Sequence, residues 1–489
     1  MAGLRGTYFK KIRYYLLIAV AALVVIACST NSAVDQNAAK QNATEQTATV
    51  STAPSETPSS KVPSEDDPLI ILWDKGYVTE EDEAIEKVVA DWTAATGIPI
   101  DLSFYNSAEI APKTLRSTKA GRSPDVLFAA KSVYPVSDWE GQLADVTDVV
   151  APLAASYNET AKQSAKVFGS ESAGDGQERY YAVPLNQSTT HIYYWKDLLS
   201  EAGYTPEDIP TDWDAFWTFW QTVQDQLEDT NPAVRSIGLP YSVDASDTYH
   251  IFEHVLAAYD VKVIDERGNL LLDDPAVKEG IVACLNWYAQ FYQDGYVPEN
   301  AVDWLDTENN RAFLDRNVVM TPNPTLSIPA AVRNDQTLYS EKLGTVEFPN
   351  KLNGEPLPHF VSIRQAVVFT DAPHLDTAKE FLTYLTEPAV LSDFLKTSYG
   401  RYMPPAKSQI QADSFWQNPA APHVFTVVKT VLDAQVQPFQ NEYNPAYGIV
   451  MERNVWGNAI DQMVSNGMSA EDATEEAIAQ IKDIFADRP

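Results

Sequence analysis

The chain has 489 residues, 45% of them apolar, with 35 lysines and arginines against 68 aspartates and glutamates. A globular chain of this length commonly folds as two or three domains with an ample core. The formal net charge of −33 repels phosphate backbones and disfavours nucleic acid as a partner, whereas a cationic ligand is attracted and a neutral one is tolerated.

The first 28 residues have the order of a secretory signal followed by a cysteine. Four basic residues precede an apolar run of twelve residues at 16–27, and Cys28 follows directly. A membrane-spanning helix needs roughly 20 apolar residues, so we expect residues 1–27 to be a cleaved signal peptide. The residues Val25, Ile26, Ala27 and Cys28 resemble a bacterial lipobox, which implies an acylated Cys28 on the mature protein. A short membrane anchor with an incidental cysteine is the alternative.

Residues 28–66 are rich in Ser, Thr, Ala, Asn, Gln and Pro and have almost no large apolar side chain. Such a segment cannot bury enough surface to offset the entropy of ordering. We therefore expect a disordered tether between the lipid anchor and the folded part.

The folded part begins with alternating strand and helix patterns. Strands are expected at 68–74, 98–105 and 124–130, with helices at 79–97 and 107–121; Thr79 is the expected N-cap of the first helix, with Asp82 as its capping partner, and Gly97 is the expected C-cap. This order predicts an α/β fold with a parallel sheet and helical crossovers. Ligands of such sheets bind beyond the carboxyl ends of the strands.

Later segments contribute further amphipathic helices. The segment 211–227 carries an aromatic stripe at helical spacing, with Thr211 and Asp214 as a capping box, and we interpret the stripe as a buried face rather than a ligand platform. Further helices are expected within 377–400 and at 469–485. Cys284 lies among apolar residues and is expected on a buried helix face.

Several segments, in this order and spacing, resemble the extracellular solute-binding proteins of the maltose-binding type: "ILWDKGY", "KAGRSPDVLFAA", "YYAVPLNQSTTHIYYWKDLLSEAGY", "PTDWDAFWTFWQTV" and "GRYMPPAKS". The resemblance implies a two-lobed periplasmic-binding-protein fold of type II, each lobe a sheet flanked by helices, with hinge strands between them. It places an N-lobe at 67–185 plus 366–412 and a C-lobe at 186–365 plus 413–489. The hinge crossings fall near "YAVPLNQ" and "FVSIRQAVVF".

The resemblance also implies a function: the substrate-binding subunit of an ABC importer, which captures a small carbohydrate or polyol in the cleft between the lobes and does no chemistry on it. Aromatic rings would stack on the sugar ring, and planar polar groups would pair with its hydroxyls. The position where maltose-type relatives carry a tryptophan is Ala129 here, which argues against maltodextrin.

The expected ligand contacts come from both lobes. Those of the N-lobe are Trp73, Asp74, Lys75, Tyr105, Asn106, Lys131, Ser132, Gly400 and Arg401. Those of the C-lobe are Asn186, Gln187, Ser188, Tyr194, Asp247, Tyr249, Trp304 and Asn323. Trp304 is chosen because its polar surroundings offer a large ring little core to fill, and Arg401 because a guanidinium fork suits vicinal hydroxyls or a carboxylate.

Two other classes of function stay open, an enzyme and a binding protein for another solute. His250, Glu253 and His254 have the H-x-x-E-H order of one class of zinc hydrolase, although a third ligand is not evident, and a glycoside hydrolase is not excluded by composition. The other alternative is a binding protein for a cationic or osmolyte-type solute, which the net acidity favours slightly.

The expected setting is that of an exported, lipid-anchored protein. We expect it on a bacterial membrane, facing the periplasm or exterior, and held to the bilayer by acylated Cys28. Its expected partners are the sugar and the ABC permease subunits; a monomer without cofactor or metal is expected.

Overall fold

The computed structural model describes residues 67–130, 141–166 and 179–487. The predicted signal peptide, Cys28, the tether at 28–66, Lys131 and Ser132 lie outside these ranges. In the described part, no helix is long and apolar enough to cross a bilayer.

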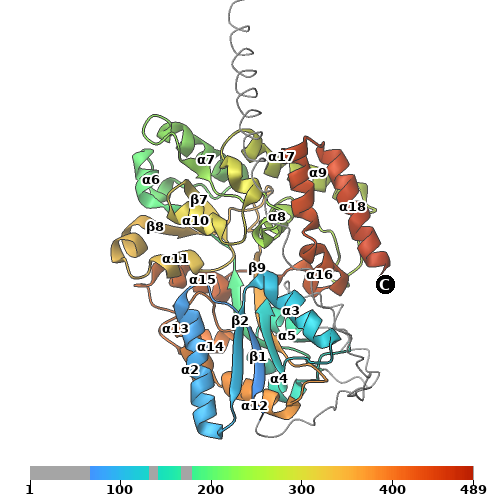
Figure 1. Cartoon of the computed structure of the whole chain (residues 1–489). Coiled ribbons are helices and arrows are strands. Elements are labelled where there is room, and N and C mark those ends of the chain that lie inside the picture. Colours follow the sequence, from blue (N-terminus) through green and yellow to red (C-terminus); the bar gives the residue numbers. More distant parts are fainter. Residues whose placement is uncertain (1–66, 131–140, 167–178, 488–489) are drawn as a thin grey trace, which may run out of the picture. The chain divides into compact units, whose positions relative to one another are not determined.

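The first sheet confirms the expected strand and helix alternation. Strand β1 (Leu69–Asp74) pairs in parallel with β2 (Ile100–Tyr105) and β3 (Val126–Ala130), and α2 (Thr79–Thr96) and α3 (Ser107–Lys119) make the crossovers. Strands β9 (His359–Val367), β10 (Val436–Pro438) and β4 (Val183–Thr189) complete six strands in the order β10-β9-β3-β1-β2, with β4 paired to β9. Figure 1 shows α2 beside α13 (Pro388–Thr397), and these two helices pack on each other. The other helices of this lobe, the N-lobe, are α4 (Thr147–Ala154), α5 (Glu159–Lys166), α12 (Leu375–Leu385) and α14 (Lys407–Ala412).

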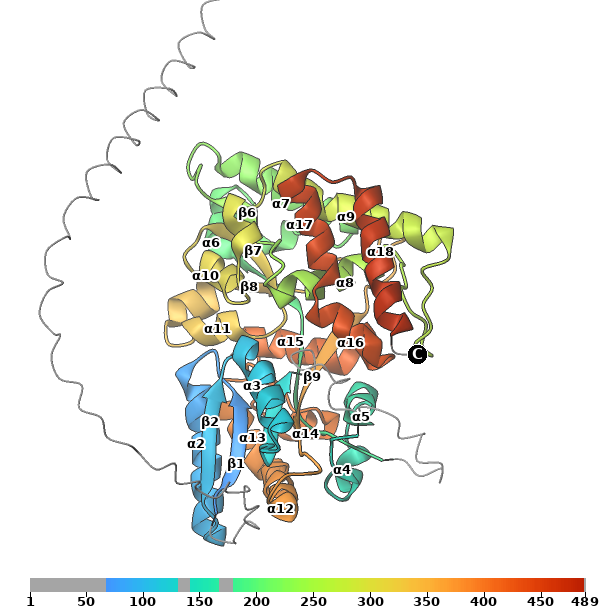
Figure 2. The ribbon, with the colours of Figure 1, turned by 45° about the vertical axis from the view of Figure 1, so that its right-hand side comes forward.

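The second sheet has four strands in the order β6-β7-β5-β8 and forms the core of the C-lobe. Its strands are β5 (His191–Trp195), β6 (Arg235–Ile237), β7 (Val318–Asn323) and β8 (Leu343–Val346). The helices around it are α6 (Lys196–Glu201), α7 (Trp213–Leu227), α8 (Ser246–Ala258), α9 (Pro275–Gln293), α10 (Glu308–Leu314), α11 (Ser327–Val332) and α15 (Pro422–Asp433). The C-terminal helices α16 (Pro445–Glu452), α17 (Val455–Asn466) and α18 (Ala470–Ala486) pack with α8 and α9 (Figure 2).

Strands β4 and β9 join the two lobes. They pair with each other antiparallel in the six-stranded sheet, and only Thr190 separates β4 from β5 of the other sheet. Both strands are the apolar runs in which the sequence places the crossings. The six-stranded sheet thus includes the chain up to Thr189 and again from His359.

Two of the predicted helix starts are wrong by one residue. Val78, not Thr79, is the N-cap of α2, and the carboxylate that reaches back to the N-cap nitrogen is Glu81, 3.4 Å from it, not Asp82. In α7 the N-cap is Asp212 instead of Thr211. Gly97 does cap α2 in the left-handed region, as its lack of a side chain permits.

The predicted buried faces are confirmed. The aromatic stripe of α7, including Trp213, Trp217 and Trp220, is buried, and Cys284 is a buried free thiol on α9. The prediction that Trp304 has little core to fill is wrong. Only 2% of its side chain is exposed and it belongs to the hydrophobic core, so the core is large enough at this point to take the ring.

Candidate functional site

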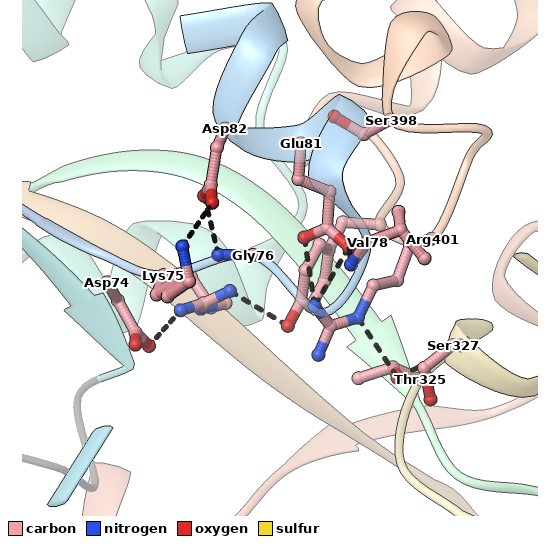
Figure 3. A network of polar contacts seen from close by, with 12 residues as sticks. Asp74, Lys75, Gly76, Val78, Glu81, Asp82, Thr325, Ser327, Ser398 and Arg401 are labelled. Carbon is pink, nitrogen blue, oxygen red and sulfur yellow. Dashed lines mark hydrogen bonds and ion pairs between the residues drawn. The ribbon is translucent and has the colours of Figure 1, made fainter. Parts of the chain in front are cut away.

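A network of charged side chains lies where the carboxyl end of β1 meets the first turn of α2 (Figure 3). Gly76 links the two elements, and a Cβ there would come within 2.5 Å of the Cβ of Glu81, so only glycine allows this tight approach. The carboxylate of Asp82 accepts bonds from the Gly76 nitrogen and from Lys75 Nζ, both at 2.8 Å. The acidic first turn also suits the positive end of the helix dipole.

Asp74 and Arg364 form a buried ion pair in the N-lobe. Asp74 is 5% exposed and also accepts a bond from Ser107 Oγ at 3.2 Å, while Arg364 Nη1 donates to the Tyr402 hydroxyl at 2.8 Å. Burial raises the pKa of Asp74, and the Arg364 guanidinium opposes this rise. Arg364 thus fixes both the Asp74 carboxylate and the Tyr402 ring.

Arg401 extends the network from the N-lobe to the C-lobe. Its Nη1 contacts both carboxylate oxygens of Glu81, at 3.0 and 2.8 Å, and its Nε lies 3.5 Å from Thr325 Oγ1 just after β7. The Arg401 carbonyl accepts a bond from the Leu326 nitrogen at 3.3 Å. The guanidinium fork expected to hold a ligand is therefore engaged by Glu81.

A second contact between the lobes lies beside the first. Arg333, at the end of α11, forms an ion pair with Glu80 of α2. The Arg333 guanidinium also lies 3.8 Å from the ring centroid of Tyr399. Two arginines therefore join the lobes on the same side.

The C-lobe contributes uncharged amides and hydroxyls. Asn323, at the end of β7, bonds to Asn310, and its Oδ1 accepts from the Thr325 nitrogen at 3.0 Å. Asn309 donates to Asp247 at 3.0 Å. Burial and the nearby Asp306 raise the pKa of Asp247 well above its usual value.

A small cavity lies inside the N-lobe part of the network, bordered by Trp73, Asp74, Asn186, Arg364 and Tyr402 among others. It has room for about one water molecule. Two residues at its border each have one buried polar atom, Asn186 Oδ1 and Arg364 Nε, without a hydrogen-bond partner within the described residues. An unpaired donor and acceptor at one cavity are the features that a hydroxyl-bearing ligand would satisfy.

The structure brings some of the predicted residues to this network. Trp73, Asp74 and Asn186 border the small cavity, and Arg401 and Asn323 meet around Thr325. The ring of Trp73, however, stacks on Phe128 at 4.0 Å and packs edge-on against Phe394.

Other predicted residues have different surroundings. Tyr194 packs against Trp220 and Gly344, whereas its neighbour Tyr193 donates to the Thr325 carbonyl at 2.9 Å, because successive strand residues face opposite sides. The Gln187 amide is paired with Asn158 and Pro404. The remaining predicted residues lie at the end of β2 and the start of α3 (Tyr105, Asn106), on the buried strand β4 (Ser188), within α8 (Asp247, Tyr249), in the core (Trp304), on the exposed turn after β1 (Lys75) and in the turn after α13 (Gly400).

Sequence reasoning missed Glu81, Arg364 and Tyr402. For Arg364 a signal existed, because it is the one charged residue in the apolar run "FVSIRQAVVF". A buried charge needs a partner, and that requirement points to a carboxylate such as Asp74.

The H-x-x-E-H residues lie on α8, where their side chains are hydrogen-bonded to other protein groups. His250 Nδ1 and His254 Nδ1 each contact the backbone carbonyl four residues earlier at 2.8 Å, and Glu253 bonds to Gln440 and Tyr447. Burial lowers the pKa of His254 to about 3. No group of three or more His, Cys, Asp or Glu side chains in the described ranges is placed to hold a metal ion.

Comparisons with known proteins agree with this architecture. A family model described as bacterial extracellular solute-binding protein matches residues 87–423. No curated protein matches the chain. Among solved structures, the maltose-bound MalE3 of T. maritima has a TM-score of 0.69 at 19% identity, covering 85% of this chain and 99% of its own.

Two further structures are similar. A solute-binding protein of Thermotoga lettingae with bound α-D-tagatose has a TM-score of 0.69 at 16% identity and covers 85% of this chain and 98% of its own. A sugar transporter protein of Arthrobacter chlorophenolicus with bound laminaribiose has a TM-score of 0.67 at 14% identity, covering 85% and 99%. At identities this low, the structural similarity shows the shared two-lobed fold alone.

Proposed function

The chain belongs to the bacterial extracellular solute-binding proteins, and from that premise we propose that it captures a small neutral carbohydrate between its lobes for an ABC importer. The site is the network around Asp74, Asn186, Arg364 and Arg401. The ligand leaves as it entered, without a chemical step.

The observation that carries this proposal is the pair of unpartnered atoms, Asn186 Oδ1 and Arg364 Nε, at one buried cavity. A sugar hydroxyl both donates and accepts, so it can satisfy each of them. The three carboxylates of the network, Asp74, Glu81 and Asp82, are already matched by Arg364, Arg401 and Lys75. This charge balance favours a neutral ligand over the cationic solute that the overall acidity suggests.

Entry of a sugar requires the lobes to separate. The cavity holds about one water molecule, and Arg401 with Thr325, together with Arg333 with Glu80, joins the two lobes. A hinge at β4 and β9 would let these contacts open and then close on the ligand. The ligand shifts that equilibrium only by its better contacts with the closed state.

The bound sugars of the structural neighbours support a carbohydrate over other neutral solutes. Maltose, tagatose and laminaribiose occupy three proteins of the same fold. Export and membrane attachment rest on the sequence of residues 1–28, which supports a cleaved signal and an acylated Cys28. We further propose that the mature protein is a monomer that delivers its ligand to permease subunits.

Calorimetric titration with neutral monosaccharides, disaccharides and polyols tests the function. We expect saturable binding of at least one neutral carbohydrate at micromolar affinity, about −8 kcal/mol. Asn186→Leu should weaken that binding at least tenfold, and Asn466→Ala, on the exposed end of α17, should not. Absence of binding by every carbohydrate in the panel would refute the proposal.

A further inference from the structure

A second and much larger cavity, of about 820 Å³, lies apart from the network described above and shares no bordering residue with the small cavity. Three chain segments form its walls: residues 253–266 from α8 onward, residues 347–360 between β8 and β9, and residues 433–443 around β10. Its volume is in the range of pockets that bind small molecules.

Carboxylates dominate the walls of this cavity. Seven acidic residues border it, against two lysines; the acidic residues are Glu253, Asp260, Asp265, Glu266, Glu347, Glu355 and Asp433. Lys351 is engaged by Asp260 at 2.7 Å and Glu355 at 3.3 Å. In the described part of the chain, Glu253, Glu266 and Asp433 form no salt bridge with a basic side chain.

Glu253 is the buried member of this set. It is 1% exposed, and among the described residues its carboxylate accepts bonds from neutral groups, Gln440 Nε2 at 2.6 Å and the Tyr447 hydroxyl at 3.1 Å. The Gln440 side chain also borders the cavity, and its Oε1 is buried without a hydrogen-bond donor among the described residues. A buried carboxylate without a cation favours a positively charged group, and an unpaired acceptor needs a hydrogen-bond donor; an ammonium group supplies both.

We propose that this cavity binds a linear polyamine, an organic cation whose ammonium groups pair with carboxylates on the three walls. Ammonium groups spaced along one chain suit acidic side chains that come from separate segments. Apolar and aromatic side chains, including Ile264, Phe348 and Phe360, line the walls between them and suit the methylene links and cation–π contact. A metal ion fits less well, because no three candidate ligands converge within the described residues.

Titration of the full protein with spermidine at about 0.15 M salt, where long-range surface attraction is screened, tests this site. We expect one saturable site per chain. Ala257→Phe, which places a ring in the cavity without changing its charge, and the double variant Glu266→Gln/Asp433→Asn should each weaken binding at least tenfold. The control Glu228→Gln/Asp229→Asn removes two exposed carboxylates at the end of α7 and should change the affinity less than twofold.

The alternative results are distinguishable. Absence of saturable binding, or an equal loss in the control and the cavity variants, would overturn the site and assign any attraction to net charge. If Asn186→Leu loses spermidine binding and Ala257→Phe retains it, the polyamine binds between the lobes, and the proposed site in the larger cavity is overturned. Thermal unfolding verifies that each variant folds. The double variant changes only exposed side chains, so its spermidine affinity tests the site even if Ala257→Phe does not fold. Carbohydrate titrations of the same variants report on the cleft separately, so either proposal can fail alone.

Discussion

Asn186 and Arg364 face each other across the β4–β9 ladder, and each keeps one buried polar atom without a partner in the described residues. Both residues border the small cavity, and only Thr190 separates β4 from β5 of the other sheet. Unpaired buried polar groups are uncommon in native proteins, and each one calls for an explanation.

The first prediction concerns the opposite effects of Asn186→Leu on affinity and stability. Leucine removes the orphan acceptor at similar volume, so we expect carbohydrate affinity to fall at least tenfold while the free energy of unfolding rises by about 1 kcal/mol. Calorimetry and urea unfolding measure the two quantities. A parallel loss of both would mean that Asn186 is structural.

The second prediction concerns the buried pair of Asp74 and Arg364. Arg364→Met leaves the Asp74 carboxylate buried without a cation, and we expect a loss of about 3–5 kcal/mol in the free energy of unfolding. The double variant Arg364→Met/Asp74→Asn should recover most of this loss, because the uncompensated charge is gone. Additive losses in urea unfolding would contradict the coupling.

The third prediction concerns the ion pair between Glu80 and Arg333, which joins the lobes. Glu80→Gln removes a partly exposed pair worth about 1 kcal/mol, so the closed state should become less favoured and carbohydrate affinity about fivefold weaker. Glu83→Gln, an exposed change on the same helix, is the matched control. Small-angle X-ray scattering at subsaturating ligand should find a larger radius of gyration for Glu80→Gln than for Glu83→Gln. Identical behaviour of the two variants would show that the Glu80–Arg333 pair does not stabilise the closed state.

The fourth prediction concerns the pH dependence that Glu253 imposes. Burial raises its pKa from 4.5 to about 7, so between these values the folded state binds more protons than the unfolded state. The free energy of unfolding should therefore fall as pH rises from 4.5 to 7, by about 3 kcal/mol from this residue. Urea unfolding across this pH range should show that Glu253→Gln lacks this fall in the free energy of unfolding and that Glu266→Gln retains it. Equal slopes in all three proteins would show that Glu253 does not titrate in this range.

The fifth prediction concerns membrane attachment. If Cys28 carries the lipid, Cys28→Ala should leave the protein in the soluble fraction after cell lysis, whereas Cys284→Ala, a buried thiol on α9, should remain with the membrane. Fractionation followed by immunoblotting distinguishes the two. Membrane retention of Cys28→Ala would favour an uncleaved anchor.

The sequence by itself determined the local elements and the family resemblance. Apolar runs and helical periodicity locate β1, α2, β2, α3 and β3, and the stripe of α7, because these patterns depend only on neighbours within a few residues. The alternation of strand residues also puts Leu72 and Trp73 on opposite faces, in separate apolar clusters. The identity of the residues that cover each face does not follow from that alternation.

Only the tertiary structure decided which polar groups meet. Asp74 pairs with Arg364 across 290 residues of sequence, and Glu81 pairs with Arg401 across 320. These pairs form because β9 joins the sheet that contains β1, next to β3, and because α13, which precedes Arg401, packs on α2. The return of α13 also packs Phe394 edge-on against Trp73, and Phe128 of the neighbouring strand β3 stacks on the same ring, which the sequence suggested as a sugar platform. Pairing of this kind depends on strand order and chain return, which no local pattern encodes.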